Sequence, residues 1–196
     1  MVSMKKTVTK AAVILPFEEQ LLRDNGIDAT FVGHPILDRA REERDTLALG
    51  SGPVLALFPG SRAQEVERLI EPFVGAAQEA QRRVPGLRVV VSHAPNVTID
   101  PARCPYPVVD APSMSILRAA TAVLCKSGTT TLEAAVAGCP LVIAYKTSRL
   151  TYQIARRMVT IPYIGMVNVV AGKSIAREFI QDGVQPPAMA DALVPL

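Results

Sequence analysis

The sequence contains no tryptophan, and aromatic residues make up only 5% of its 196 residues. Proteins that hold single-stranded nucleic acid stack the bases on aromatic side chains, and this chain has few of them. Its formal net charge is only +3, and no run of lysine and arginine is long enough to form a basic arm. These absences argue against nucleic acid as a partner.

Cysteine is also scarce. The chain has three, Cys104, Cys125 and Cys139, an odd number without the spacing of a metal site. Cys125 and Cys139 lie in apolar or helix-end settings, which predicts buried thiols in a reducing cytosol. No apolar run reaches the length of a membrane span, and the N-terminus has no signal-peptide core. We expect a soluble, cytoplasmic protein, with attachment to a membrane surface left open.

The 49% of hydrophobic residues can fill a core of one large domain, or of one domain and part of another. From residue 53 onward, apolar strands alternate with amphipathic helices. This alternation predicts a three-layer αβα, Rossmann-like fold with a parallel sheet. Residues 41–52 lie in a stretch that is charged and then rich in Gly and Ser, and are predicted to be a linker.

The predicted strands are residues 11–15, 30–32, 53–58, 87–91, 108–109, 122–125 and 141–144. The predicted helices are residues 17–25, 64–84, 113–120, a segment ending at Gly138, 148–158, 174–181 and 187–196. Residues 162–171 are predicted to be a loop.

The most informative stretch runs from Ala122 to Pro140. A buried strand leads into the turn Lys126-Ser127-Gly128-Thr129, and a helix follows. Backbone N–H groups at a helix N-terminus, with about +0.5 of an elementary charge from the helix dipole, suit a phosphate. Glu133, one helical turn further on, has a carboxylate that suits ribose hydroxyls. The alternative is a capping sequence from Thr129 to Glu133 with no ligand.

A second turn, Pro59-Gly60-Ser61-Arg62, also joins a strand to a helix. The carboxyl ends of parallel strands share one edge of the sheet, where ligands bind, so the two turns should meet there. Arg62 can pair with a diphosphate, and Glu65 can hold Arg62 or cap the helix. The alternative for Arg62 is a solvated residue, although a cation opposes the dipole at a helix N-terminus. Neither of the glycine-rich motifs of Rossmann dehydrogenases and P-loop NTPases occurs.

These motifs resemble the lipid-A-disaccharide synthase family. The resemblance runs along nearly the whole chain and rests on the segments 15–18, 31–35, 57–66, 126–133 and 168–172. The family is an inverting, metal-independent glycosyltransferase of the two-domain GT-B architecture. It joins a UDP-diacylglucosamine donor to a lipid acceptor, diacylglucosamine 1-phosphate, and releases UDP.

The resemblance also implies roles for single residues and for the parts of the chain. Arg62 and Asn168 would be catalytic, and no cofactor and no metal is implied. Residues 1–40 would be the last strand–helix–strand unit of the N-terminal GT-B domain, and residues 53–196 a truncated C-terminal UDP-sugar-binding domain. The implied UDP-binding residues are Gly60, Ser61, Arg62, Ser127, Gly128, Thr129 and Glu133.

The family has a complete N-terminal domain ahead of the matched region, and that domain brings much of the acceptor site and the general base. We therefore expect this chain alone to be inactive. His34 is interpreted as a turn residue rather than a catalytic one, and His93 as a ligand-contacting or an exposed loop residue. The cations Lys146, Arg149, Arg156 and Arg157 form either a solvated helix face or a contact with the cytoplasmic face of the inner membrane. Two other functions stay open: a non-catalytic UDP-sugar-binding module and a UDP-sugar epimerase.

Overall fold

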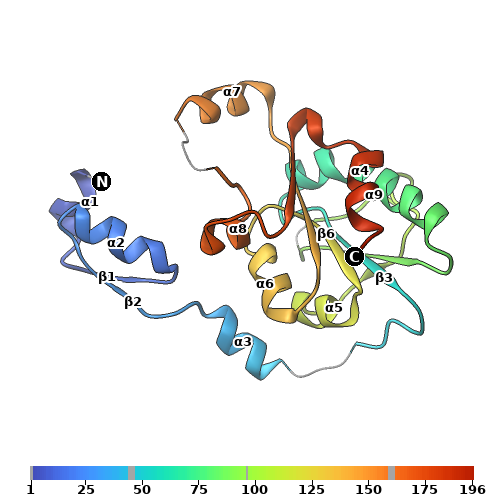
Figure 1. Cartoon of the computed structure of the whole chain (residues 1–196), viewed down its shortest axis with the longest axis horizontal. Coiled ribbons are helices and arrows are strands. Elements are labelled where there is room, and N and C mark those ends of the chain that lie inside the picture. The colour runs from blue at the N-terminus through green and yellow to red at the C-terminus, as the bar shows by residue number, and fades with distance from the viewer. Residues whose placement is uncertain (1, 44–46, 96, 159–161) are drawn as a thin grey trace. The chain divides into compact units, whose positions relative to one another are not determined.

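The structure is a computed structural model that describes residues 2–43, 47–95, 97–158 and 162–196. The chain divides into two compact units, Met1–Glu43 and Arg44–Leu196 (Figure 1). Each unit has its own buried apolar cluster, so each is described by itself.

The first unit is a small strand–helix–strand motif between two further helices. Its strands run parallel, with Lys10 opposite Asp28 and Val13 opposite Phe31. Parallel strands need a crossover, and the helix between them supplies it. Val13, Leu22, Ile27 and Ala29 form its buried core. The elements are α1 (Val2–Thr7), β1 (Lys10–Val13), α2 (Pro16–Asp24), β2 (Asp28–Phe31) and α3 (Ile36–Glu42).

The second unit is built on a parallel sheet of six strands in the order β5-β4-β3-β6-β7-β8. Its strands are β3 (Val54–Phe58), β4 (Arg88–Ser92), β5 (Val108–Val109), β6 (Ala122–Lys126), β7 (Leu141–Tyr145) and β8 (Arg177–Ile180). Its helices are α4 (Ala63–Arg83), α5 (Ser113–Ala119), α6 (Thr130–Ala137), α7 (Arg149–Met158), α8 (Met166–Ala171), the 3₁₀ turn η1 (Gln181–Gly183) and α9 (Pro186–Leu193).

The central strand β3 is buried on both faces, as expected for a parallel sheet covered on both sides. Leu55 and Leu57 join one core cluster with apolar residues of α4 and α9. Val54, Ala56 and Phe58 join a second cluster with residues of α5, α6 and α8. The sheet therefore lies between two helical layers, visible in Figure 1, and the predicted three-layer fold is confirmed.

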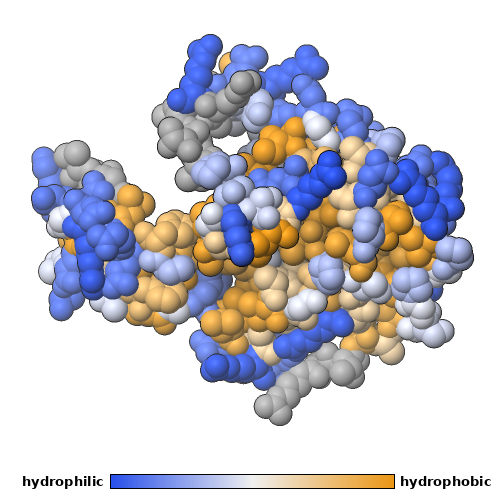
Figure 2. Space-filling model, in the orientation of Figure 1, coloured by the Kyte–Doolittle hydropathy of each residue, from blue (hydrophilic) through white to orange (hydrophobic). Residues whose placement is uncertain are grey.

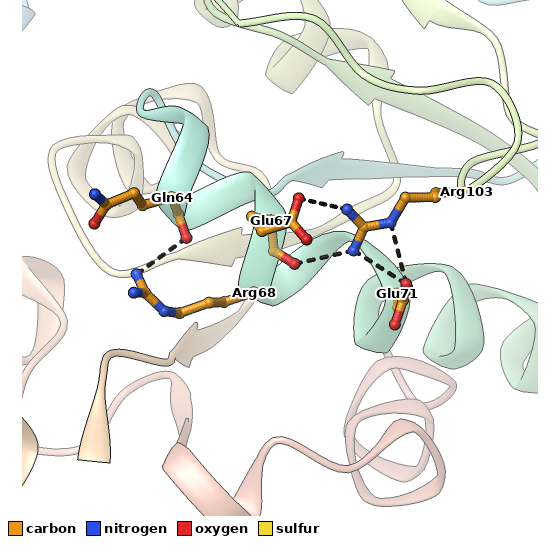
Figure 3. A network of polar contacts seen from close by, with 5 residues as sticks. All are labelled: Gln64, Glu67, Arg68, Glu71 and Arg103. Atoms are coloured by element: carbon orange, nitrogen blue, oxygen red, sulfur yellow. Dashed lines mark hydrogen bonds and ion pairs between the residues drawn. The ribbon is translucent and has the colours of Figure 1, made fainter. Parts of the chain in front are cut away.

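Ion pairs fasten the long connection between β4 and β5 to α4. Arg103 pairs with Glu67 and Glu71 of α4 and also donates to the Glu67 carbonyl oxygen at 3.1 Å (Figure 3). Val97, Ile99 and Cys104 of the same connection are buried in the core cluster with α4. The described residues of this proline-rich segment thus form no helix or strand, but they are anchored to α4.

Three predictions about single elements were wrong. Residues 174–181 were expected to be a helix, but Arg177–Ile180 is the strand β8, paired in parallel with β7. The expected loop 162–171 contains the helix α8, which ends at Gly172 in the left-handed region with φ = 63°. Part of the charged stretch that was assigned to the linker is helical, because α3 extends to Glu42.

The strand order reverses direction at the centre of the sheet. From β3 the chain moves outward to β4 and β5, then returns to β6 beside β3 and moves outward the other way. Connections on either side of such a switch point leave a crevice at the carboxyl ends of the two central strands. The turns after β3 and β6 are the two that the sequence singled out.

Candidate functional site

A cavity of about 770 Å³ lies at this switch point. Gly60 and Ser61 line it from the turn after β3, and Gly128 and Thr129 line it from the turn after β6. Glu133 of α6 also lines it. The structure therefore brings together five of the predicted nucleotide-contacting residues. Ser127 and Arg62 are not among the lining residues, and neither is Asn168.

The turn after β6 leaves backbone donors exposed to the cavity. Within the part of the chain that the structure describes, the amides of Gly128, Thr129 and Thr130 have no hydrogen-bond partner. Gly128 and Thr129 precede the eight-residue helix α6 and Thr130 begins it, so their amides lie at the positive end of its dipole. A Cβ built on Gly128 would meet only the Lys126 Nζ, at 3.8 Å. Free amides beside an ammonium group are suited to an anion.

Ser127 connects this turn to neighbouring segments of the chain through hydrogen bonds. Its side chain is buried, its amide donates to the Ala144 carbonyl oxygen at 2.9 Å, and its hydroxyl donates to the Ile164 carbonyl oxygen at 2.5 Å. Thr131 ties the start of α6 to both sides: its hydroxyl donates to Gly128 O at 2.8 Å and accepts from Val167 N at 3.3 Å. The contacts of Ser127 are thus those of a residue that positions the turn.

The turn after β3 is occupied by the carboxylate of Glu65. The Ser61 amide donates to Glu65 Oε2 at 3.0 Å, and Arg62 Nη1 pairs with Glu65 Oε1 at 3.2 Å. Of the two roles that the sequence left open for Glu65, holding Arg62 is confirmed. The amide of Ser61 lies one residue before the N-cap Arg62, and no side-chain hydrogen bond caps α4. Gly60 has φ = 134°, and a Cβ at this residue would lie 2.7 Å from Glu65 Oε2. Glycine is therefore required here for backbone conformation and for space.

Lys126 is a second cation that contacts Glu65. Its Nζ lies 3.1 Å from Glu65 Oε1 and 5.8 Å from the centroid of the Tyr145 ring. Burial alone would raise the pKa of Glu65. The hydrogen bonds from Lys126 and the Ser61 amide, and the charges of Lys126 and Arg62, outweigh burial and lower that pKa below its usual value. Glu65 is thus ionised at neutral pH and holds Lys126 between the two turns.

Glu133 is buried, with 7% of its surface exposed, and lines the cavity. The sequence left open whether it caps the helix or contacts a ligand. Thr129 is the N-cap of α6, yet no side-chain hydrogen bond caps this helix. The predicted capping interaction is therefore not formed.

Asn168 is fully buried and holds neighbouring segments together. Its Oδ1 accepts from the amides of Ile175 and Ala176, both at 2.9 Å. Its Nδ2 donates to Ala176 O and to Glu178 Oε1, both at 2.8 Å. Glu178 in turn accepts from the amides of Ile164 and Gly165 at 3.0 and 2.9 Å. Every donor and acceptor site of the Asn168 amide is used, so its contacts are those of a positioning residue.

The structure also places one acidic residue and the two histidines relative to the cavity or to a local turn. Asp110 and His93 line the cavity, at the ends of β5 and β4. Sequence reasoning missed Asp110, although its place directly after Val109 put it at the ligand-binding edge. His34 accepts from Ile36 N at 3.1 Å through its Nδ1, the local turn contact that was expected.

The three cysteines are free and buried, which confirms the prediction made for Cys125 and Cys139. Burial raises the pKa of Cys139 to about 12, and it also raises the pKa values of Cys104 and Cys125. Among the described residues, no group of three or more His, Cys, Asp or Glu side chains could hold a metal ion. No described helix is both long and apolar enough to span a bilayer.

The second unit is thus a Rossmann-like domain with a cavity at its switch point, the architecture of one half of a GT-B fold. A solved structure agrees on the fold: the crystal structure of CalG4, the calicheamicin glycosyltransferase, superposes with a TM-score of 0.54. The likeness covers 94% of this chain and 42% of that one, at 22% sequence identity.

The chain belongs to the lipid-A-disaccharide synthetase family, whose sequence profile matches residues 1–196. The lipid-A-disaccharide synthase of Burkholderia mallei (strain SAVP1) is 42% identical over 205 residues, covering 95% of this chain and 52% of that protein. The synthase of Trichlorobacter lovleyi is 39% identical over 201 residues, with the same coverage. This chain therefore spans about half the length of the curated relatives that it matches.

Proposed function

We propose that this chain supplies the donor-nucleotide half of a glycosyltransferase in lipid A biosynthesis. The reaction joins UDP-2,3-diacylglucosamine to 2,3-diacylglucosamine 1-phosphate and gives lipid A disaccharide 1-phosphate and UDP. The observation that supports this most is the cluster of three free amides at Gly128, Thr129 and Thr130 beside Lys126. The diphosphate of UDP would accept from these amides, and Glu133 would accept from the ribose hydroxyls.

Inverting transfer breaks the bond between the sugar and the diphosphate, so negative charge develops on the diphosphate. Fixed amides, the dipole of α6 and Lys126 stabilise that charge without rearranging, which lowers the barrier. Arg62 has 80% of its side chain exposed and can swing toward the same anion. In this proposal Arg62 assists the departure of UDP, and Asn168 acts through the turn that it positions.

The acceptor hydroxyl must lose a proton to a base on the opposite side of the sugar. The matched relatives are about twice as long as this chain, and we propose that their remaining half supplies the base and most of the acceptor site. In this view residues 1–40 are the end of that other domain, and residues 41–52 link it to residues 53–196.

The acceptor is a lipid, so we also propose contact with the cytoplasmic face of the inner membrane. Exposed apolar side chains support it, including Leu150 on α7 and Ile175 before β8, which are 72% and 54% exposed. Figure 2 shows hydrophobic areas interspersed with hydrophilic ones on the visible face of the second unit, which carries α7 and β8. Arg149 and Arg157 of α7 add positive charge for acidic headgroups.

Calorimetry with UDP tests the donor site directly. UDP should bind the folded chain, and Arg62→Ala should weaken the binding of UDP more than that of uridine, because the lost contact is to phosphate. Absence of heat with UDP at millimolar concentration would contradict the proposal. A non-catalytic UDP-sugar-binding module would bind UDP equally well, so turnover in the presence of the other half separates the two functions.

A further inference from the structure

A second hollow, of about 410 Å³, lies beside the donor cavity at the same edge of the sheet. We propose that this hollow is a subsite for a phosphomonoester, the phosphate group of the second substrate. The inference rests on the proposed function, because a second, phosphorylated substrate is part of it. The hollow is separate from the cavity described above, and Glu65 and Lys126 line both.

The charges of this hollow favour an anion. Four basic side chains line it: Arg62, Arg68, Lys126 and Lys146. The acidic side chain among the lining residues is Glu65, and it is already paired with both Arg62 and Lys126. Positive charge therefore exceeds negative charge in the walls, and a doubly charged phosphate would be drawn to it.

Two of these cations have no carboxylate partner among the described residues. Lys146 makes no hydrogen bond or ion pair there, and Arg68 donates only to the Gln64 carbonyl oxygen, at 3.1 Å. Figure 3 shows Arg68 extending away from the ion-pair network that surrounds Arg103. The acidic residues of that network, Glu67 and Glu71, therefore pair with Arg103 rather than with Arg68.

The wall that carries Lys146 is held in place by a strained residue. Gln181 has φ = 51°, and it alone among the described residues other than glycine has a positive φ. Its buried side chain makes two hydrogen bonds with the backbone of Thr147: it accepts from Thr147 N at 2.6 Å and donates to Thr147 O at 3.1 Å. Backbone strain of this kind persists where the surrounding structure enforces it, and it concentrates at ligand sites.

Arginine and lysine in a fixed hollow match the oxygens of a phosphate better than those of a neutral sugar. In the proposed function, the diphosphate of the donor binds at the free amides of the turn after β6. The second hollow is therefore free to bind a separate phosphate. Lys126 lines both hollows, so the two anions would bind on either side of it.

The test uses the whole chain and glucosamine 1-phosphate as a water-soluble probe, titrated by calorimetry with and without saturating UDP. Glucosamine 1-phosphate should still bind when UDP is bound, and glucosamine should not bind detectably. The double variant Arg68→Ala/Lys146→Ala should weaken the sugar phosphate about tenfold or more, because two charge-assisted contacts are lost. Its affinity for UDP should stay within about twofold, since neither residue lines the donor cavity.

Arg82→Ala is the matched control, because Arg82 is an exposed arginine of α4 that pairs with Glu79 far along the helix. It should change neither affinity. Lys146→Gln serves as a second, milder variant, and thermal melting confirms that each variant folds. Complete displacement of the sugar phosphate by UDP, or equal weakening of both ligands in the double variant, would overturn the proposal.

The remaining outcomes separate this subsite from the donor function. Binding of UDP without binding of glucosamine 1-phosphate removes the subsite and leaves the donor function. Binding of the sugar phosphate without UDP leaves the subsite and removes the donor function. Binding only to vesicles of phosphatidylglycerol, lost in the double variant, would assign the hollow to a lipid phosphodiester and overturn the proposal.

Discussion

Glu65 organises the site at the scale of single residues. One carboxylate accepts from the Ser61 amide just before α4 and also pairs with Arg62 and Lys126. Because these groups come from two different turns, the loss of one charge would alter both. The same carboxylate stands in both hollows, so its ionisation matters for stability and for binding.

Glu65→Gln should lower the free energy of unfolding by about 1 kcal/mol at pH 7, because the charge on two contacts is lost. The pKa of Glu65 is lowered in the folded protein, so its contribution is present above the usual value of 4.5 and is lost as the pH falls through the lowered pKa. Urea denaturation should therefore show the wild type and the variant converging in acid. An unchanged difference between pH 7 and pH 3 would contradict this.

Glu133→Gln should reduce UDP affinity by about 1–3 kcal/mol, the range for a hydrogen bond to a charged group. The glutamine keeps the volume of the buried side chain, so the loss should come from binding, measured by calorimetry. Thermal melting serves as the control. If the variant unfolds at a much lower temperature but binds UDP normally when folded, Glu133 has a structural role instead.

The site residues differed in how well the sequence could place them. Gly60, Ser61, Gly128 and Thr129 follow buried strands directly, so the carboxyl-edge rule sufficed. Asn168 could not be placed in this way, because its four hydrogen bonds depend on where residues 175–178 lie after folding.

At the scale of elements, tertiary contacts decided the secondary structure of two segments that the local sequence pattern predicted wrongly. The segment 174–181 has apolar residues at spacings that suit a helix, yet β8 forms because β7 offers an unpaired edge and Phe179 packs into the core. The helix α8 contains three valines, which have low helix propensity, and it forms between two glycines at its ends. Both segments depend on tertiary contacts, which sequence periodicity does not report.

Asn168→Ala should destabilise the protein by about 2–4 kcal/mol, because the amides of Ile175 and Ala176 and the carbonyl of Ala176 lose their partner. UDP affinity per folded molecule should change much less. Chemical denaturation and calorimetry measure the two effects. Normal stability combined with lost turnover would instead support a direct catalytic role for Asn168.

At the scale of the whole molecule, the long strands and the helix α4 were predicted to within a few residues, because their apolar patterns are strong. The linker was harder, since the charged residues of α3 give no core-facing period. The chain divides into two compact units at Glu43, a boundary that depends on contacts rather than on composition. That the first unit is the end of another domain stays a prediction.

The chain alone should bind UDP and form no disaccharide from UDP-diacylglucosamine and diacylglucosamine 1-phosphate. Turnover should appear when the unmatched half of the Burkholderia mallei relative is added, because that half would supply the base and the acceptor site. Product release measured by chromatography checks both. Turnover by residues 1–196 alone, abolished by His34→Ala, would show that the base lies in this chain.

The three buried thiols provide a measure of integrity for all these variants. Since burial raises the pKa of each, they should react with Ellman's reagent far more slowly in the folded chain than in urea. Fast labelling in native buffer would show that the core around β6 opens readily.

The position of Lys126 between the two hollows has a kinetic consequence. One ammonium group cannot serve two anions fully, so a phosphate in either hollow should loosen the anion in the other. Thermodynamic linkage makes this antagonism equal in both directions, whichever ligand arrives first. An enzyme built in this way would bind its second substrate at some expense of its hold on the nucleotide, and spent UDP would leave faster when fresh acceptor is plentiful.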